Sequence, residues 1–351
     1  MIKPVNPGPD DKVYPVIKLA TVVEALGEEG IPAQDALAGV RLSKEAISSP
    51  TTRISLNQVI ECYRNAAKLS RDPHFAYHTG QRFHLSAYGM YGFAILSSMD
   101  YRQTMQFAEQ YHQLATPLTE LHFKEQSDFG FWKIIPIVNS RIDWSLYKFL
   151  VEMQLGICIS LHRDVMGPLF AAREFHVTYR PPDDATKYQA VFGCPVLFGA
   201  PENRLMFDAT WLDGTPKLGN DITYATVIEL CDRLMDELQL SAGVAGKVRR
   251  VLLTNLMQPR SFSDIAHDVN MSERTLRRKL REESTSFRNL VDELRMEMAI
   301  KYLRDTNLTV EAIAESLGFS DAANFRQAFR RWTKAAPHAF RDISSKTAMW
   351  P

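Results

Sequence analysis

The sequence predicts an α+β N-terminal domain, mostly helical with a small sheet, followed by an all-α C-terminal domain with two helix-turn-helix motifs. Three observations predict this fold class. The chain has 351 residues, which is enough for two domains that each bury a core. Apolar residues alternate along short runs between 118 and 207, a pattern typical of strands. One helical pattern occurs twice after residue 260, which indicates a pair of related helical motifs.

The first part of the N-terminal domain, residues 14–115, has mainly helical patterns. Residues 1–13 are polar and hold three prolines, so we expect them to be disordered. Breaks are expected at 32–42 and 48–53, where proline, glycine and serine interrupt the apolar pattern. Ser55 is expected to cap a helix that ends at Leu69, and residues 101–114 have the spacing of an amphipathic helix.

The second part of this domain, residues 118–207, has the patterns of a small sheet layer. Leu121 and Phe123, followed by Phe129 and residues 131–137, predict a hairpin that turns near 126–128. Residues 143–163 are expected to be helical. Further strands are expected at 175–179 and 204–207, with a short helix at 183–192 between them.

A loop containing glycine and proline, residues 211–220, marks the predicted domain boundary. The expected domains are therefore 14–210 and 241–345, joined by a linker at 211–240. Asp221 is expected to cap a helix in this linker. The helix carries an apolar stripe formed by Ala225, Ile228, Cys231, Leu234, Met235 and Leu238. It either packs back on its own domain or forms a dimer seam or a lever between the domains.

The repeated pattern in the C-terminal domain consists of a short helix, a tight turn and a second helix with a basic outer face. Ile265 and Ile313 are 48 residues apart, whereas Leu276 and Phe325 are 49 apart, so the second copy has one extra residue near its turn. This is the sequence form of a helix-turn-helix, whose second helix can lie in the major groove of DNA. The helix at 286–304 would span roughly 28 Å between the two copies.

In the first copy, Asn270 occupies the tight turn and Ser272 is expected to cap the second helix, which begins near 272 and ends near 283. Its inner face carries Leu276 and Leu280. Its other faces carry four arginines that can pair with guanine or hold phosphates: Arg274, Arg277, Arg278 and Arg281. A merely solvated basic face is the alternative, and the helix-turn-helix frame makes it the less favoured one.

In the second copy, Gly318 takes the turn position and Ser320 is expected to cap the helix at about 321–333. Phe325 and Phe329 are expected on its inner face. The exposed side carries Ala323, Asn324, Gln327 and Arg331, which are side chains that can contact base edges. Arg326 and Arg330 lie at the edges of that side, where they would suit phosphates.

Charge is unevenly divided although the formal net charge is zero. Residues 1–240 hold 22 basic and 28 acidic side chains, whereas residues 241–351 hold 19 and 13, a net charge of +6. This division indicates that the back half meets a polyanion, and double-stranded DNA is the predicted partner. No apolar run reaches the ~18 residues of a transmembrane helix, and the N-terminus is unlike a signal peptide, so a cytoplasmic protein with no membrane partner is expected.

The C-terminal motifs resemble the DNA-binding domain of the AraC/XylS family of bacterial transcription regulators. The resemblance covers residues 245–342 and is carried by the run Arg274 to Leu280, the run Ile313 to Ser320, the segment from Phe325 to Trp332, and the closing residues 337–341. It implies a DNA-binding regulator with two recognition helices. The family usually has glycine after each recognition helix, where this chain has Ser284 and Lys334, which puts local stability in question.

The front half resembles the arabinose-binding-type regulatory domain of one branch of that family, on the stretch from Gly80 through Ala94. The resemblance implies a domain that senses an effector, and it does not make arabinose the ligand. Gly89 and Gly92 could permit close helix packing. Four aromatic side chains could line an apolar effector pocket, with an ordinary aromatic core as the alternative: Tyr91, Phe131, Trp132 and Trp144.

Motifs of catalysis are absent from the sequence: it has no nucleophile elbow, metalloprotease helix, P-loop or dinucleotide-binding glycines. We therefore predict no catalytic residue, no cofactor and no enzyme activity. His74 and His78 are spaced for a metal on a helix but lack a third ligand, so no metal is predicted. A repair-type enzyme fused to a DNA-binding module is the alternative, and it would need a reactive thiol among Cys62, Cys158, Cys194 and Cys231.

These patterns predict a sequence-specific DNA-binding transcription regulator, nucleoid-associated when bound. We expect an activator that responds to a small-molecule effector, binds promoter DNA as a homodimer and acts on RNA polymerase. A ligand-independent DNA-binding protein is the second alternative. The sequence does not indicate the effector, the operator or the dimer interface, nor does it distinguish activation from repression.

Overall fold

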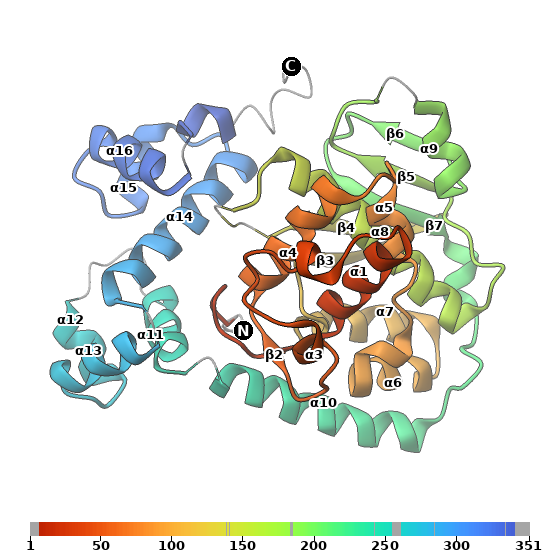
Figure 1. Cartoon of the computed structure of the whole chain (residues 1–351), viewed down its shortest axis with the longest axis horizontal. Coiled ribbons are helices and arrows are strands. Elements are labelled where there is room, and N and C mark those ends of the chain that lie inside the picture. The colour runs from red at the N-terminus through yellow and green to blue at the C-terminus, as the bar shows by residue number, and fades with distance from the viewer. Residues whose placement is uncertain are drawn as a thin grey trace. The chain divides into compact units, whose positions relative to one another are not determined.

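The computed structural model describes residues 7–137, 139, 141–182, 185–241, 243–254, 261–283, 285–333 and 335–340. Contacts divide the described chain into an N-terminal domain, residues 9–137 and 141–237, and a C-terminal domain that begins at Leu238 (Figure 1). The N-terminal domain is α+β and the C-terminal domain is all-α, which confirms the predicted fold class. In the part of the chain that the structure describes, no helix is both long and apolar enough to cross a membrane.

The N-terminal domain begins with short helices around a two-stranded ribbon. Ser55 caps the fourth helix, as predicted, and completes a capping box in which Gln58 bonds back to the Ser55 N–H. The elements of this part are β1 (Tyr14–Pro15), α1 (Ile17–Glu28), α2 (Ala33–Ala36), α3 (Lys44–Ile47), β2 (Arg53–Ile54), α4 (Leu56–Leu69), α5 (Phe75–Gly80), η1 (Leu85–Tyr88), α6 (Gly89–Ser97), α7 (Tyr101–Gln110) and η2 (His112–Ala115).

The expected disorder of residues 1–13 is wrong for part of that segment. Residues 1–6 lie outside the described residues, but Pro9 and Asp10 are held against the start of α4. The Asn57 N–H donates to the Pro9 carbonyl at 2.8 Å, and the Asn57 amide donates to Asp10 Oδ1 at 2.7 Å. The hydrogen bonds of a buried asparagine on α4 therefore hold in place a segment that its composition predicted to be disordered.

A five-stranded sheet follows, with strand order β3-β4-β7-β5-β6. The predicted hairpin is β3 paired antiparallel with β4, and β6 is a strand that the sequence analysis missed. Only β5 and β6 among the described strands are parallel to each other, because α9 forms the crossover between them. The elements are β3 (Thr119–Glu125), β4 (Phe129–Pro136), α8 (Trp144–Met166), β5 (Glu174–Val177), α9 (Ala185–Phe192), β6 (Val196–Phe198), β7 (Asn203–Asp208) and η3 (Ala209–Asp213).

The core of this domain lies between the sheet and α8. Helix α8 is buried around almost its whole circumference, since it contacts α4, α5, α6, β3 and β4. Strand β4 alternates its side chains across the sheet. Trp132 faces inward beside Phe123 and Leu205, whereas Phe131 lies on the opposite face under the guanidinium of Arg204.

The glycines of the 80–94 stretch have two different roles. A Cβ on Gly92 would lie 1.9 Å from the Leu85 carbonyl oxygen, so this glycine permits close packing, as predicted. Gly89 has no neighbour within 4 Å of such a Cβ, and the packing interpretation is wrong for it. Its φ of +54° is the reason for glycine there, because side-chain-bearing residues rarely adopt that backbone conformation.

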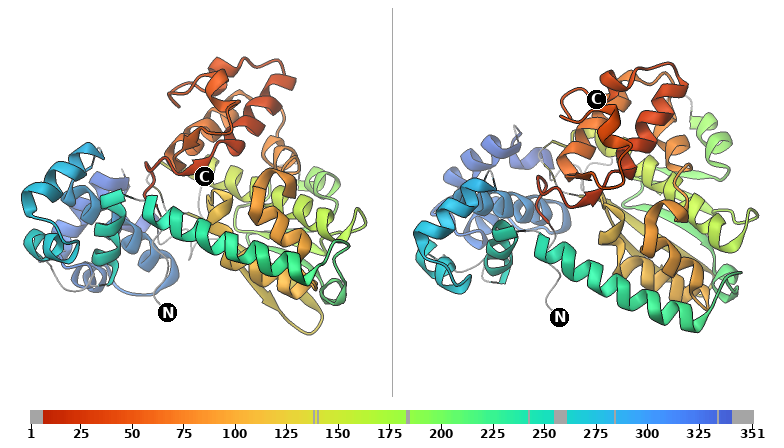
Figure 2. Two further views of the ribbon diagram at one scale, coloured as in Figure 1. Left: turned by 90° about the horizontal axis from the view of Figure 1, so that it is seen from below. Right: turned by 60° about the horizontal axis from the view of Figure 1, so that its bottom comes forward.

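Helix α10 (Asp221–Ser241) packs back on the N-terminal domain, the first of the two alternatives left open for it (Figure 2). Tyr224, Val227 and Cys231 are buried in the core of that domain, and the Tyr111 hydroxyl donates to Asp232 at 2.6 Å. Asn220 rather than Asp221 caps the helix, because its side chain accepts from the Thr223 N–H. Part of the expected stripe, Ala225 and Leu234, is exposed.

The C-terminal domain has two small apolar cores, one toward each end of its longest helix, α14 (Figure 1). The first core includes Val248, Leu276 and Leu290, and the second includes Phe325 and Phe329. The Glu283 carboxylate, just after α13, accepts from two backbone N–H groups at the start of α11, which links the end of the first motif to the helix that precedes it. The helices are α11 (Gly243–Thr254), α12 (Phe262–Asp268), α13 (Glu273–Glu282), α14 (Phe287–Asp305), α15 (Val310–Ser316) and α16 (Ala322–Thr333).

Candidate nucleic-acid interface and buried cavity

The two tight turns adopt the backbone that the sequence predicts. Asn270, between α12 and α13, has a φ of +55°, and Gly318, between α15 and α16, has a φ of +72°. Both values lie in the left-handed region, which asparagine and glycine tolerate best. The turns reverse the chain so that the second helix of each motif crosses the first and leaves one face outward.

Backbone N–H groups at the start of each motif helix are capped by short polar side chains. Ser261 caps α12, Ser272 caps α13 and Thr309 caps α15. The expected Ser320 cap of α16 is wrong, because the Asp321 carboxylate accepts from the Asn324 N–H at 2.7 Å instead. That hydrogen bond lowers the pKa of Asp321, so a negative charge stays at the start of this helix.

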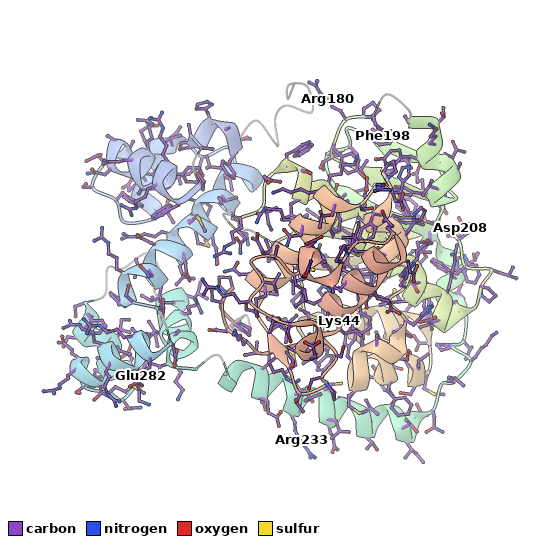
Figure 3. The ribbon with its side chains drawn as sticks, viewed as in Figure 1. Lys44, Arg180, Phe198, Asp208, Arg233 and Glu282 are labelled. Carbon is purple, nitrogen blue, oxygen red and sulfur yellow. The ribbon has the colours of Figure 1, made fainter. Side chains whose placement is uncertain are left out.

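The outward face of α13 carries the four predicted arginines, all of them exposed. Leu276 and Leu280 are fully buried beneath them. Arg278 pairs with Glu282, labelled in Figure 3, at 2.7 Å, and Arg277 lies over the Phe262 ring at 5.1 Å. An exposed ion pair of this spacing contributes only about 0.3–0.5 kcal/mol, so it does not prevent Arg278 from exchanging Glu282 for DNA.

The outward face of α16 carries the other six predicted residues, and each of them is exposed: Ala323, Asn324, Arg326, Gln327, Arg330 and Arg331. Arg326 leans toward α15, where it pairs with Glu311 at 2.7 Å, and Arg331 leans toward α14, where it pairs with Asp292 at 3.0 Å. Ala323, Gln327 and Arg330 therefore occupy the middle of the face. The Asn324 amide bonds to Ser320 and Asp321, and it must leave them to reach a base.

Free cations are available on both α13 and α16. Within the described residues, no hydrogen bond or ion pair holds the guanidinium groups of Arg274, Arg281 and Arg330. The sequence analysis missed Arg288 and Arg295, which line a groove between α14 and α16 together with Gln327 and Arg331. Their spacing of seven residues on one helix face is the signal that could have found them.

Ser284 and Lys334, which stand where the family usually has glycine after each recognition helix, lie outside the described residues.

The two motifs match a known family over residues 265–343, described as a helix-turn-helix domain. Residues 30–215, more than half of the chain, match the family described as the arabinose-binding domain of AraC transcription regulators, N-terminal.

The chain belongs to the AraC family of transcription regulators.

Curated relatives of this AraC-family chain match along nearly its whole length. The ornithine utilization regulator of Pseudomonas aeruginosa is 28% identical over 337 residues, which cover 94% of this chain and 97% of that protein. An uncharacterized HTH-type transcriptional regulator of Mycobacterium bovis is 28% identical over 339 residues, 95% of this chain and 98% of its own. The solved structure of the transcriptional regulator CdpR from Pseudomonas aeruginosa is 21% identical, covers 93% of this chain and 98% of its own, and has a TM-score of 0.49. This chain is a DNA-binding transcription regulator.

The N-terminal domain of this regulator encloses a cavity of about 50 Å³ between α1, α6, α7, η2, the sheet and α8. A single water occupies ~10–15 Å³ on this scale, so the cavity has room for about four waters. Tyr91 and Trp132, two of the four aromatics proposed for a pocket, line it. Phe131 does not, because strand alternation turns it to the other face of the sheet. Trp144 does not either; it stacks on Tyr147 at the start of α8 and is 37% exposed.

Polar groups in the cavity wall are mostly engaged with one another. Trp132 Nε1 donates to His162 Nε2 at 3.1 Å, and the other nitrogen of that ring bonds to the Tyr101 hydroxyl. The His112 ring bonds to the Thr119 carbonyl at 2.9 Å. Burial lowers the pKa of both histidines to about 3, so they are neutral at physiological pH.

The thiols and histidines weighed for other chemistry lie in packed surroundings. All four cysteines are buried, and burial raises the pKa of Cys62 and Cys194 to about 12 and that of Cys158 and Cys231 to about 11. Such thiols stay protonated, which argues against a thiol acceptor of the repair type. His74 packs edge-on against Tyr188, and His78 pairs with Asp72. Among the described residues, no cluster of three metal-binding side chains is found.

Lys18 is the cavity residue that the sequence analysis missed. It lies in the first turn of α1, is 3% exposed and forms part of the cavity wall. A signal was present in the sequence: Lys18 falls in register with Val22 and Ala25 on the inward face of an apolar helix. A lysine at a core position is rare enough to have marked the site.

Proposed function

We propose that this regulator activates transcription from a promoter, and that a small molecule in the cavity of its N-terminal domain controls it. Two exposed recognition helices on one domain are the observation that carries the DNA-binding part. Each presents arginine together with side chains that can contact bases. Helix α14, which has 19 residues and is roughly 28 Å long, lies between the two motifs, and one turn of DNA spans about 34 Å. The name of the Pseudomonas relative, which concerns ornithine utilization, supports control by a small molecule.

We also propose that the active form is a homodimer that contacts RNA polymerase at the promoter in the cytoplasm. One chain offers two major-groove helices, and a second copy would double the contacts and read a second half-site. Exposed apolar side chains on the N-terminal domain support an interface there: Ile222 on α10 is 81% exposed, and Met90 and Phe93 of α6 are also exposed. Arg233, labelled in Figure 3, lies on the exposed side of α10.

Removing residues 1–240 is expected to abolish any metabolite response while DNA binding survives. The cut is placed after α10 because removal of residues 1–210 alone would expose Tyr224, Val227 and Cys231 to water. A reporter fused to a bound promoter would be screened against a panel of metabolites with the full-length and truncated proteins. Sedimentation of both should show a full-length dimer and a truncated monomer.

Three results would contradict the proposal. A truncated protein that still responds to a metabolite would place the sensor outside the N-terminal domain. Full-length protein that occupies promoters but never changes expression under any condition would favour the alternative of a ligand-independent DNA-binding protein. A full-length monomer, both free and on DNA, would remove the dimer from the proposal.

Arg278→Ala is expected to cost sequence discrimination, by about 1–3 kcal/mol at one base pair if Arg278 reads a guanine. Arg326→Ala should instead weaken binding to all sequences by a similar factor, because Arg326 lies at the edge of α16 where phosphates are expected. Binding selection from a randomised site, carried out with each variant, measures both effects.

Glu282→Ala is the matched control for Arg278, because it removes the partner of the ion pair and leaves the arginine in place. Its specificity profile should equal that of the wild type. Equal profiles for the wild type and Arg278→Ala would exclude base reading by Arg278.

A further inference from the structure

The ammonium group of Lys18 is buried without a counter-charge. Its side chain enters the domain from α1 and reaches the cavity wall formed by α7, η2 and α8. Within the described residues, no hydrogen bond or ion pair involves the ammonium group of Lys18. Burial lowers the pKa of this amine to about 7, and the nearby Cys158 thiol acts in the opposite direction. Buried amines in proteins are normally paired, and an unpaired one is destabilising whether it is charged or neutral, so Lys18 indicates that a partner is missing.

The other polar groups of the wall do not supply that partner. His112 and His162 are neutral, and their hydrogen bonds are made within the protein. Gln154 accepts from the Thr119 hydroxyl at 2.9 Å and donates to Cys158 Sγ at 3.4 Å. Tyr88 also lines the cavity, and its hydroxyl has no hydrogen-bond partner among the residues that the structure describes.

We propose that the cavity binds a small monocarboxylate with a short apolar body, whose carboxylate pairs with Lys18 and accepts a hydrogen bond from Tyr88. This inference rests on the proposed function, since it names the chemical class of the effector. One negative charge neutralises one ammonium group, whereas a phosphate dianion would leave an uncompensated charge in an apolar cavity.

The remaining wall and the size of the cavity restrict the body of the ligand. Ile95, Met105, Leu121, Ile157 and Trp132 give the wall a mainly apolar surface. A cavity of about 50 Å³ holds about four waters, so a ligand of a few non-hydrogen atoms fits without repacking. Butyrate, with six non-hydrogen atoms, is a probe of this charge that is somewhat larger than four waters and needs small shifts of the wall, and butyramide is its neutral counterpart of nearly the same shape.

The experiment compares butyrate and butyramide on the full-length protein at matched ionic strength, by calorimetric titration and by the thermal unfolding temperature. Butyrate should bind and raise the unfolding temperature of the wild type, and butyramide should do neither. Lys18→Met keeps the length of the side chain but removes the charge, and it should lower butyrate affinity at least tenfold. It should fold, because it removes a desolvated amine from the core.

Two further variants keep the test decisive. Lys44→Met changes an exposed lysine of α3, labelled in Figure 3, and should retain the full butyrate response. Tyr88→Phe removes only a hydroxyl and should weaken butyrate without removing it. Equal responses to butyrate and butyramide, or an unchanged affinity in Lys18→Met, would overturn the proposal.

The pH dependence gives a readout that folding defects do not imitate. The titratable groups that face the cavity are Lys18 from α1, Tyr88 from η1, Tyr91 from α6, Tyr101 from α7, His112 from η2, and Cys158 and His162 from α8. Of these, only Lys18 titrates between pH 6 and 9, since burial raises the pKa of the tyrosines and of Cys158 and lowers that of the histidines. Butyrate stays ionised in this range, so its affinity should fall about tenfold per pH unit above about pH 7.

Failure of this inference differs from failure of the proposed function. Butyrate binding is measured without DNA, so its result depends only on the cavity and not on promoter binding. If butyrate binds through Lys18 but leaves promoter activity unchanged, the site is real and the effector switch is wrong. If a metabolite controls the reporter through the N-terminal domain but no carboxylate binds, the switch stands and the assignment of a carboxylate is wrong.

Discussion

Raising the salt concentration from about 50 to about 200 mM is expected to weaken DNA binding by this regulator about a thousandfold. A protein that neutralises phosphates releases the cations condensed on them, and six or more such contacts give a loss of this size. The exposed arginines of α13 and α16, together with Arg288 in the groove beside α16, provide that number. The net charge of +6 over residues 241–351 acts in the same direction.

Fluorescence titration of a labelled duplex over a salt series measures the slope of affinity against salt. Arg330→Ala should reduce that slope by about one, because a free guanidinium at the middle of the α16 face loses its phosphate. Gln327→Ala, one turn earlier on the same face, is a control that should leave the slope unchanged. An affinity that is equal at low and high salt would contradict the binding of DNA phosphates by the arginines of these helices.

The C-terminal domain could be predicted in detail because its sequence pattern is local. A turn residue that tolerates positive φ, a cap three residues before a backbone donor and apolar residues at helical spacing each act over a few positions. Asn270, Ser272 and Leu276 all have the roles that such rules assign to them. The exception at Asp321 is a competition between two adjacent caps, Ser320 and Asp321, which local rules do not resolve.

The N-terminal domain was predicted less well because its site is formed by long-range packing. Lys18 and His162 line the same cavity although 144 residues separate them in the sequence. The strand β6 has only three residues, Val196–Phe198, which is too short a run for an alternating pattern to mark it, and its pairing with β5 places it in the sheet. Phe131 was assigned to the pocket with Trp132, but neighbours on a strand point to opposite faces, so only one of the two can line a given cavity.

Truncation of Phe325 is expected to unfold the second helix-turn-helix motif while the first remains folded. The Phe325 side chain is fully buried, and its ring lies 5.5 Å from that of Phe319 and 5.6 Å from that of Phe329. Phe325→Ala should lower the free energy of unfolding of this core by about 3–5 kcal/mol, through lost burial and the cavity left behind. A core this small cannot absorb such a loss, since whole domains have a stability of only about 5–15 kcal/mol.

The first motif should survive because the two cores share no side chain. Leu276 and Leu280 pack on α11, α12 and the start of α14, whereas Phe325 packs on the far part of α14 and on α15. Amide hydrogen exchange should therefore lose protection in α15 and α16 of Phe325→Ala and retain it in α13. DNA affinity should fall toward that of a single motif. Arg326→Ala, the exposed neighbour, is the control and should keep protection in both motifs. Loss of protection in α13 as well would show that α14 couples the two motifs into one cooperative unit, and the separate cores would then not fold as separate units.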